Sequence, residues 1–267
     1  MTDAIRFEDK VVIVTGAGGG LGRAHALLFA RHGARVVVND LGGSTHGEGA
    51  NASAADKVVE EIRAFGGTAV ANHDSVTDGD KIVQTALDHF GRIDVLVNNA
   101  GLALGLEPAD KTDFADWQQM VNTNILGLIH LTHEILPSMV ANNDGYIINL
   151  SSTAGSYPYF GGNVYGATKA FVTQFSLNLR ADLVGKNIRV SNIEPGLCGG
   201  TEFSNIRFHG DDAKAAQVYD SVQYVTPQDI ANMVAWLIEQ PKHVNINRIE
   251  VMPTAQTFAG LKVVKDL

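Results

Sequence analysis

The sequence predicts a doubly wound α/β fold, in which a single domain holds seven parallel strands with helices on both faces of the sheet. Three observations predict it. The chain has 267 residues, a length that one α/β core can organise. Short runs rich in β-branched residues recur along it, with helix-like stretches between them. These short runs are nearly all apolar, as expected of parallel strands covered on both faces.

The strands are expected at residues 11–14, 35–39, 68–71, 93–98, 145–149, 188–193 and 248–251. The helices between them are expected at residues 21–32, 52–65, 80–90, 113–140, 164–184 and 227–239. Residues 41–51 are rich in glycine and polar side chains and predict a loop, and residues 196–212 form a second irregular stretch. Both stretches follow strands, and open α/β sheets bind their ligands at the carboxyl ends of strands.

The composition argues against several classes of partner. The net charge is −9 and the pI is near 5.4, so attachment to nucleic acid or to anionic lipid is not expected. No segment approaches the length of about eighteen apolar residues that would predict a membrane span. The amino terminus lacks the layout of a secretory signal and Cys198 is the single cysteine, which favours the reducing cytoplasm. The expected partner is a small-molecule substrate.

A glycine-rich turn follows the first expected strand directly. The segment TGAGGGLG at residues 15–22 has GxxxGxG spacing and leads into an apolar helical stretch. Glycines let the backbone turn sharply and approach a pyrophosphate, whose charge then lies at the amino terminus of the next helix. A tight turn alone can use glycines, but this strand-turn-helix context predicts a Rossmann-like dinucleotide site. The expected contacts are Gly16, Gly18, Gly20, Leu21 and Gly22.

A carboxylate closes the second expected strand. Asp40 lies at about the distance from the turn where an adenosine ribose is expected. It can accept hydrogen bonds from both ribose hydroxyls and would repel a 2′-phosphate. Positions 18 and 19 of the turn are glycines, and no basic residue stands beside Asp40. NAD is therefore favoured as cofactor, with NADP possible. The alternative is that Asp40 only caps the glycine-rich loop.

Two further polar residues follow strands on the cofactor side. Asp74, after the third strand, is expected to bond the adenine amine. Asn99, after the fourth strand, is expected to border the same crevice. Alternatively, either residue could only stabilise a turn, since Asp and Asn side chains often hydrogen-bond to the backbone of turns.

Tyr165 and Lys169 are four residues apart in an expected helix, so their side chains project from one face. A phenol with a pKa near 10 is a poor acid/base at neutral pH, and a nearby ammonium lowers that pKa. Hydride transfer at a carbinol needs such a proton acceptor. Ser152 ends the fifth strand, and its hydroxyl can hold the substrate oxygen beside the phenol. Without this context, such a Tyr–Lys pair is more often a surface pair and such a serine a turn former.

Asn124 lies inside the helix expected at residues 113–140, where asparagine has poor helix propensity. An interior asparagine indicates a local hydrogen bond or a bound water. A role as proton relay or as helix-distorting residue is therefore expected.

Together these residues resemble the short-chain dehydrogenase/reductase family over essentially the whole chain. The motifs are TGAGGGLG at 15–22, NNAG at 98–101, Asn124, Ser152, the Tyr165-Gly-Ala-Thr-Lys169 run and Pro195-Gly196. The resemblance implies that Asn124, Ser152, Tyr165 and Lys169 form a catalytic tetrad, and that Lys169 also holds the nicotinamide ribose. It further implies that Pro195, Gly196 and the residues through Thr201 border the nicotinamide, and that the enzyme is a homo-oligomer, commonly a tetramer.

The two halves of the chain resemble different subfamilies. Residues 6–97, expected to supply most cofactor contacts, are similar to the dehydrogenase module of peroxisomal multifunctional enzymes that act on (3R)-hydroxyacyl-CoA. Residues 98–267, expected to supply catalysis and substrate binding, resemble bacterial 3-hydroxy acid dehydrogenases that accept serine and related short acids. The second subfamily usually uses NADP, bound through basic residues after the second strand, where this chain has Asp40.

The resemblance in the substrate half implies hydride transfer to or from a short 3-hydroxy acid such as serine, 3-hydroxyisobutyrate or 3-hydroxypropionate, with Tyr165 as acid/base. Asp40 favours NAD(H) as the cofactor of this reaction. Three alternatives stay open. They are a (3R)-hydroxyacyl-CoA dehydrogenase, an NADP-linked 3-hydroxy acid dehydrogenase, and a dinucleotide-binding protein without turnover.

A cationic side chain is expected to anchor the carboxylate of a hydroxy acid. Arg207 is the one arginine in the second irregular stretch, so it is the candidate for substrate binding. Equally, Arg207 could pair with Asp211 or Glu202 at the surface. His130 and His133 have a spacing seen in some metal sites, but no third ligand is apparent, and no metal is expected.

Overall fold

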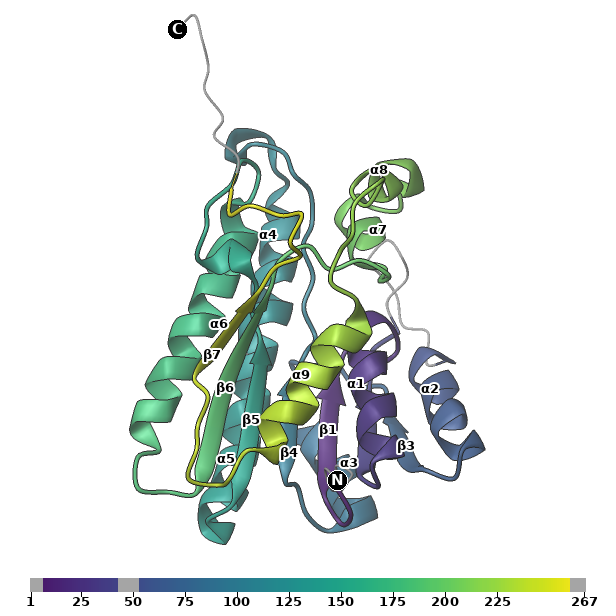
Figure 1. The fold of residues 1–267 in the computed structure, drawn as a ribbon, viewed down its shortest axis with the longest axis vertical. Helices are drawn as coiled ribbons and strands as arrows, with labels where there is room; N and C mark the ends of the chain where they lie inside the picture. Colours follow the sequence, from purple (N-terminus) through teal and green to yellow (C-terminus); the bar gives the residue numbers. More distant parts are fainter. Residues whose placement is uncertain (1–6, 43–52, 260–267) are drawn as a thin grey trace, which may run out of the picture.

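Figure 1 shows the computed structural model of the chain, which describes residues 7–42 and 53–259. Seven strands form one parallel sheet in the order β3-β2-β1-β4-β5-β6-β7. The strands are β1 (Val11–Thr15), β2 (Arg35–Asn39), β3 (Thr68–Asn72), β4 (Val95–Asn98), β5 (Gly145–Leu150), β6 (Ile188–Pro195) and β7 (Arg248–Val251). The predicted doubly wound, seven-stranded parallel sheet is confirmed.

The order of the strands reverses at β1. From β1 the chain passes to β2 and β3 on one side, and then it crosses to the other side of β1 to form β4. Val14 of β1 pairs with Val38 of β2 and with Val97 of β4, so the carboxyl ends of these three strands lie together. Ligands of open α/β sheets bind at such a reversal, and the glycine-rich turn lies there.

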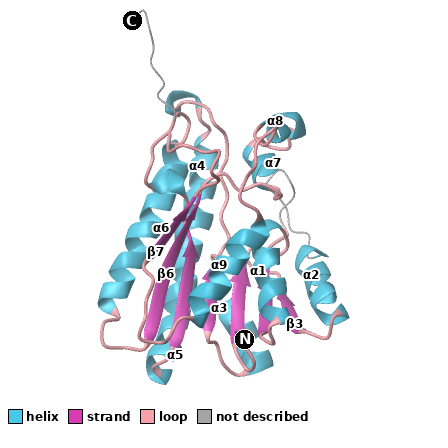
Figure 2. Ribbon diagram, viewed as in Figure 1, coloured by secondary structure: helices cyan, strands magenta, loops and turns pink. Residues whose placement is uncertain are grey.

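Helices cover both faces of the sheet (Figure 2). One face is covered by α1 (Gly20–Arg31), α2 (Ser53–Ala64) and α9 (Pro227–Glu239), and the other by α3 (Gly79–Phe90), α5 (Leu128–Asn142) and α6 (Asn163–Asp182). Side chains alternate along each strand, so Val12 and Val14 pack in the first layer and Val11 and Ile13 in the second. All four are fully buried, which explains why the strands read as unbroken apolar runs.

The long helix expected at residues 113–140 is three segments. α4 (Phe114–Val121) passes into a π-helical turn, Asn122–Gly127, before α5 begins. The side chain of Asp113 caps α4 by accepting a hydrogen bond from the amide of Ala115. π-Helical turns inside α-helices occur often at functional sites, and this one contains Asn124.

The second irregular stretch contains two short helices, α7 (Phe203–Arg207) and the beginning of α8 (Asp212–Gln217). Two 3₁₀ turns, Ala109–Lys111 and Thr153–Gly155, complete the helical elements of the described ranges. Most of the loop expected at residues 41–51, and Ala52 at the start of the expected second helix, lie outside the described residues. Across residues 7–42 and 53–259, no helix combines the length and the apolar character needed to span a bilayer.

Candidate active site

A cavity of about 820 Å³ opens at the carboxyl ends of the strands. This volume is in the range of small-molecule and cofactor pockets. The predicted site residues that line it are Gly16, Gly18, Gly20, Leu21, Asp40, Asp74, Asn99, Ser152, Tyr165, Lys169, Pro195, Gly196, Thr201 and Arg207. Two predicted residues, Gly22 and Asn124, are instead buried behind the lining residues.

The glycine-rich turn has the conformation that an approaching pyrophosphate requires. Gly16 has a φ of 61° and Gly20 a φ of 47°, in the left-handed region that residues with a Cβ rarely adopt. A Cβ on Gly22 would lie 2.1 Å from the carbonyl oxygen of Gly16, so α1 can begin this close to β1 only with glycine there. No described side chain caps α1 at Gly19. The first amides of α1 therefore remain available to an anion, and the turn fits a dinucleotide pyrophosphate.

Asp40 lies beside the turn with both carboxylate oxygens engaged. Oδ2 accepts a hydrogen bond from the amide of Gly18 at 2.8 Å, and Oδ1 accepts one from the amide of Gly42 at 2.7 Å. Asp40 therefore does cap the backbone of the glycine-rich segments, which is the role that the sequence left open as an alternative. A carboxylate oxygen has a further lone pair, so each oxygen keeps the capacity to accept one more hydrogen bond from a ligand in the cavity.

Asn99 braces the turn from β4. Its Nδ2 donates to the carbonyl oxygens of Thr15 at 2.9 Å and Gly16 at 3.1 Å. The hydroxyl of Thr15 accepts hydrogen bonds from the amides of Asn99 at 3.1 Å and Ala100 at 2.9 Å. Asn99 thus links the ends of two neighbouring strands, and its side-chain nitrogen is occupied by the backbone of the turn.

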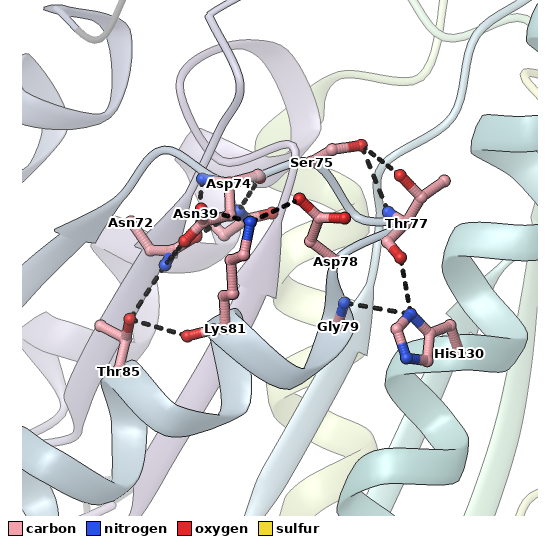
Figure 3. Close-up of polar contacts among 10 residues, drawn as sticks. All are labelled: Asn39, Asn72, Asp74, Ser75, Thr77, Asp78, Gly79, Lys81, Thr85 and His130. Carbon is pink, nitrogen blue, oxygen red and sulfur yellow. Dashed lines mark hydrogen bonds and ion pairs between the residues drawn. The ribbon is translucent and has the colours of Figure 1, made fainter.

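A network of polar side chains supports Asp74 (Figure 3). Nδ2 of Asn72 donates to Oδ2 of Asp74 at 2.8 Å and to the hydroxyl of Thr85 at 2.9 Å. Nδ2 of Asn39 donates to Oδ1 of Asn72 at 2.8 Å and to the carbonyl oxygen of Asp74 at 2.9 Å. Asn39 and Asn72 are buried, and sequence reasoning missed both. The signal was available, because a polar residue ending an otherwise apolar strand needs a hydrogen-bond partner.

The segment after Asp74 is fastened to α5 by His130, as Figure 3 also shows. Nδ1 of His130 lies 2.6 Å from the carbonyl oxygen of Thr77 and 3.2 Å from the amide of Gly79. The Nδ1 atom of His130 therefore contacts the backbone of the segment before α3. Within the described part of the chain, no group of three or more His, Cys, Asp or Glu residues is arranged to hold a metal ion.

Tyr165 and Lys169 lie one turn apart near the start of α6, and both are buried. The ammonium nitrogen of Lys169 is 5.9 Å from the centroid of the Tyr165 ring. It donates a hydrogen bond to the carbonyl oxygen of Leu150, the last residue of β5, at 2.9 Å. This bond holds the lysine against the end of the strand, with its charge facing the tyrosine ring.

Ser152 begins the 3₁₀ turn Thr153–Gly155 after β5. Its hydroxyl oxygen accepts a hydrogen bond from the amide of Ala154 at 3.1 Å and donates one to the carbonyl oxygen of Pro195 at 3.3 Å. Ser152 is thus a cap of this turn, as the alternative interpretation held, and it lines the cavity together with Tyr165. Its position joins the ends of β5 and β6 at the cavity wall.

The two buried titratable groups have shifted pKa values. Burial raises the pKa of Tyr165 to about 12, while the positive charge of Arg207 acts in the opposite direction. Burial lowers the pKa of Lys169 to about 8. The direction is opposite to the lowered Tyr165 pKa expected from the sequence, because the removal of water from the phenolate outweighs the charge of Arg207.

Asn124 lies in the π-helical turn and is buried. Its Oδ1 accepts a hydrogen bond from the amide of Leu102 at 2.9 Å, and its Nδ2 donates to the carbonyl oxygen of Leu102 at 2.9 Å and to the hydroxyl of Thr168 at 3.0 Å. The local bond expected of an interior asparagine is thus made to the backbone of another segment. A Cβ on Gly101 would lie 3.1 Å from Nζ of Lys169 and 3.3 Å from Oδ1 of Asn124, so glycine keeps these two groups close.

The segment after β6 crosses the cavity toward the glycine-rich turn. A Cβ on Gly20 would lie 3.2 Å from the side chain of Thr201, which shows how closely this segment approaches. Gln256, which sequence reasoning missed, accepts a hydrogen bond from the amide of Leu197 at 2.6 Å. A Cβ on Gly196 would lie 2.3 Å from the same Gln256 oxygen, so glycine is needed after Pro195 for this contact.

Arg207 ends α7 and points into the cavity. Its Nη2 donates to the hydroxyl of Tyr159 at 2.6 Å, and its guanidinium carbon lies 5.2 Å from the centroid of the Tyr165 ring. The surface pairing considered as an alternative is wrong, because among the described residues neither Asp211 nor Glu202 forms an ion pair with it. Asp211 instead pairs with Lys214 at 3.5 Å.

The reversal of strand order and the glycine-rich turn define a dinucleotide-binding α/β protein. Comparison with known proteins gives the family. The model of the short chain dehydrogenase family matches residues 10–211. A relative from Haemophilus influenzae, "Probable NADP-dependent dehydrogenase", is 56% identical over 97% of this chain and 99% of its own length. The chain therefore belongs to the short chain dehydrogenase family and is an oxidoreductase that uses a nicotinamide dinucleotide.

Two further relatives carry more detailed names. The "NADP-dependent 3-hydroxy acid dehydrogenase YdfG" of Salmonella typhimurium is 50% identical over 95% of this chain and 98% of its own length. A solved structure described as "The Closed form of serine dehydrogenase complexed with NADP+" is 45% identical, with a TM-score of 0.87, over 96% of this chain and all of that chain. Both alignments span the two halves of the sequence, so the likeness to 3-hydroxy acid dehydrogenases extends beyond residues 98–267.

Proposed function

We propose that the chain oxidises short 3-hydroxy acids of the serine, 3-hydroxyisobutyrate and 3-hydroxypropionate type, or reduces the corresponding carbonyl compounds. The observation that carries this substrate class is Arg207, a guanidinium inside the cavity that no carboxylate of the described residues pairs. A substrate carboxylate would supply the missing negative charge within reach of the Tyr165 phenol. The names of the relatives from Salmonella typhimurium and of the solved serine dehydrogenase support the same class.

In this proposal Tyr165 is the acid/base and Ser152 holds the reacting oxygen of the substrate. During oxidation the phenolate takes the hydroxyl proton while a hydride leaves the carbinol carbon. When bound, an oxidised nicotinamide would supply the hydride acceptor for this step. Lys169 supplies a further cation beside Tyr165 and is proposed to hold the nicotinamide ribose. Asn124 is proposed to position the Lys169 ammonium, because it fixes the backbone of Leu102 beside Gly101.

The cofactor is proposed to lie along the cavity from the glycine-rich turn to α6. Its pyrophosphate would meet the amides at the start of α1, and its adenosine would lie between Asp40 and Asp74. The residues proposed to border it are Gly16, Gly18, Gly20, Leu21, Asp40, Asp74, Asn99, Tyr165, Lys169, Pro195, Gly196 and Thr201, while Gly22 lies behind them and lets α1 begin close to β1.

We predict that NAD is preferred over NADP, although the relatives are named for NADP. Asp40 places a negative charge beside the turn, and residues 36–56 contain neither lysine nor arginine to pair a 2′-phosphate. The expected kcat/KM is about tenfold or more higher with NADH than with NADPH, since like charges at close range disfavour binding. Asp40→Asn should narrow this ratio, chiefly by improving use of NADPH. A higher kcat/KM with NADPH in the unaltered protein would show that this assignment of Asp40 is mistaken.

Arg207→Met tests the substrate class. The loss of the cation should raise KM for 3-hydroxy acids by about tenfold to a hundredfold, because a charge-assisted hydrogen bond is lost, and it should spare neutral alcohols. Steady-state kinetics on both kinds of substrate measure the difference. Equal effects on acids and neutral alcohols would remove Arg207 from the role of anchor.

The proposed function is tested directly by a steady-state screen of serine, 3-hydroxyisobutyrate, 3-hydroxypropionate and 3-hydroxybutyryl-CoA, each with NAD and with NADP. Turnover of the free acids in preference to the CoA ester is expected. Preference for the CoA ester would favour the hydroxyacyl-CoA alternative, and binding of NADH without turnover of any substrate would favour a non-catalytic dinucleotide-binding protein.

A cytoplasmic location and assembly into a homo-oligomer, commonly a tetramer, are further proposals. They rest on the single cysteine and on the family resemblance, respectively. Light scattering of the purified protein would measure the mass of the assembly, and a mass near 28.5 kDa, that of one chain, would contradict the oligomer.

A further inference from the structure

We propose that Tyr159 is a positioning residue for substrate charge: its hydroxyl holds the Arg207 guanidinium over the Tyr165 ring, so that the cation faces the place of a substrate carboxylate. This inference rests on the proposed function, because it concerns the same cavity and the same class of acid. Tyr159 itself would not touch the reacting atoms. It would determine specificity by fixing the direction in which Arg207 presents its charge.

The surroundings of the guanidinium are aromatic, and no carboxylate of residues 7–42 or 53–259 forms an ion pair with it. The guanidinium carbon of Arg207 lies 5.2 Å from the centroid of the Tyr165 ring, 5.4 Å from that of Phe203 and 5.8 Å from that of Tyr159. Its Nη2 donates to the Tyr159 hydroxyl at 2.6 Å. Its Nε is buried and has no hydrogen-bond partner among the described residues.

The half-buried guanidinium of Arg207 has a buried Nε and one neutral acceptor among the described residues, so its donors are incompletely satisfied. Guanidinium has five N–H donors, and burying an unpaired cation costs free energy unless an anion or several acceptors compensate. The ring faces around Arg207 attract the cation but accept no hydrogen bond in the plane of the guanidinium. The arrangement therefore leaves in-plane donors for a planar anion, which is the geometry of a carboxylate.

Both ends of the Tyr159–Arg207 contact are fixed by the backbone. The carbonyl oxygen of Arg207 accepts a hydrogen bond from the amide of Gly105 at 2.9 Å, which ties the end of α7 to the segment after β4. The amide of Gly162 donates to the carbonyl oxygen of Tyr159 at 3.0 Å and closes a turn before α6. The Tyr159 ring lies directly against Gly162, where a Cβ would come within 2.8 Å of a ring carbon. The tyrosine is thus held in place before any ligand binds.

A purely structural role would make the hydroxyl a link between the loop before α6 and α7. Loss of such a link would lower stability and affect all substrates alike. A positioning role instead affects charged substrates selectively, because only they bind Arg207. The two roles are separated by comparing a 3-hydroxy acid with its methyl ester, which keeps the carbinol and removes the negative charge.

The test uses the full-length protein with each of two variants, Tyr159→Phe and Gly162→Ala. The first removes the hydroxyl and keeps the ring, and the second keeps the hydroxyl but displaces the ring through the added Cβ. Each is expected to raise KM for the acid about tenfold, with KM for the ester and kcat for both substrates within about twofold of the unaltered protein. Tyr157→Phe is the matched control, because its hydroxyl in the same loop donates to Glu250 of β7 at 3.2 Å and not to Arg207.

Three results would overturn the inference: an unchanged KM for the acid in Tyr159→Phe, an equal rise for acid and ester, or the same rise in Tyr157→Phe. Thermal unfolding of each variant shows whether it is folded, and Gly162→Ala supplies a second measurement if one variant is not. Failure of the proposed function looks different, because the unaltered protein would then show no preference for the acid over its ester. Loss of that preference in Arg207→Met but not in Tyr159→Phe would overturn the role of Tyr159 alone.

Discussion

Tyr165→Phe is expected to lower kcat for oxidation of a 3-hydroxy acid by about a thousandfold, since general acid–base groups contribute factors of about a hundred to ten thousand. The change removes one oxygen atom and keeps the ring that packs 5.8 Å from Phe203 and 5.2 Å from the Arg207 guanidinium. The shape of the cavity and the binding of the dinucleotide should therefore be retained. Single-turnover kinetics give the rate of hydride transfer, and titration of NADH fluorescence gives the affinity for cofactor.

The control for this experiment is Tyr146→Phe, which removes another buried phenol oxygen. That hydroxyl lies 2.7 Å from the hydroxyl of Ser191 between β5 and β6, and neither residue lines the cavity. Its loss should leave kcat nearly unchanged. If Tyr165→Phe retained more than about a tenth of the activity, the proton would have to be taken by another group, and the proposed acid/base would be wrong.

Lys169→Met is expected to abolish most activity and at the same time to stabilise the fold. Burial lowers the pKa of Lys169 to about 8, so at neutral pH the folded protein pays for a buried charge that the unfolded chain exposes to water. Removing that charge should raise the free energy of unfolding at pH 7 by about 1–3 kcal/mol, after allowance for the lost hydrogen bond to Leu150. Urea unfolding measures the difference, and Lys186→Met, at an exposed position, is the control.

The pH dependence of this effect has a definite sign. Below pH 8 the lysine is charged in both the folded and the unfolded state, so the full penalty of burial applies. Between pH 8 and the unperturbed pKa of 10.5 the folded protein loses the proton first, and the penalty shrinks as pH rises. The stability advantage of Lys169→Met should therefore be smaller at pH 9.5 than at pH 7. An advantage that is equal at both pH values, or a less stable variant at pH 7, would contradict the assignment of the cost to the buried charge.

The sheet could be predicted because its pattern is local. Strands buried on both faces read as apolar runs, and the seven expected runs correspond to the seven strands within two residues at each end. The π-helical turn at Asn122–Gly127 could not be predicted, because its extra residue is stabilised by contacts with other segments. The side chain of Asn124 bonds Leu102, and Gly127 lies so close to Val76 that a Cβ there would come within 2.4 Å.

The polar side chains of the site also divide into those that the sequence could predict and those that it could not. The spacing of Tyr165 and Lys169 on one helix face is a property of the helix itself, so the sequence was sufficient to predict it. The hydrogen-bond partner of Arg207 comes from another segment of the chain, since Tyr159 precedes α6 whereas Arg207 ends α7. No spacing rule indicates such a contact, and the expected alternatives, Asp211 and Glu202, were only neighbours in sequence.

By itself, then, the sequence determined the order of strands and helices, the glycine-rich turn and the residue types that gather at the strand ends, because these follow from periodicity and backbone conformation. The tertiary structure alone decided the electrostatics of the site. Tyr165 and Lys169 have pKa values shifted by burial, and the carboxylate of Asp40 bonds the amides of Gly18 and Gly42. Exclusion of water and contacts between distant segments, such as that of Asp40 with Gly18, set most of these properties, and neither is a function of spacing along the chain.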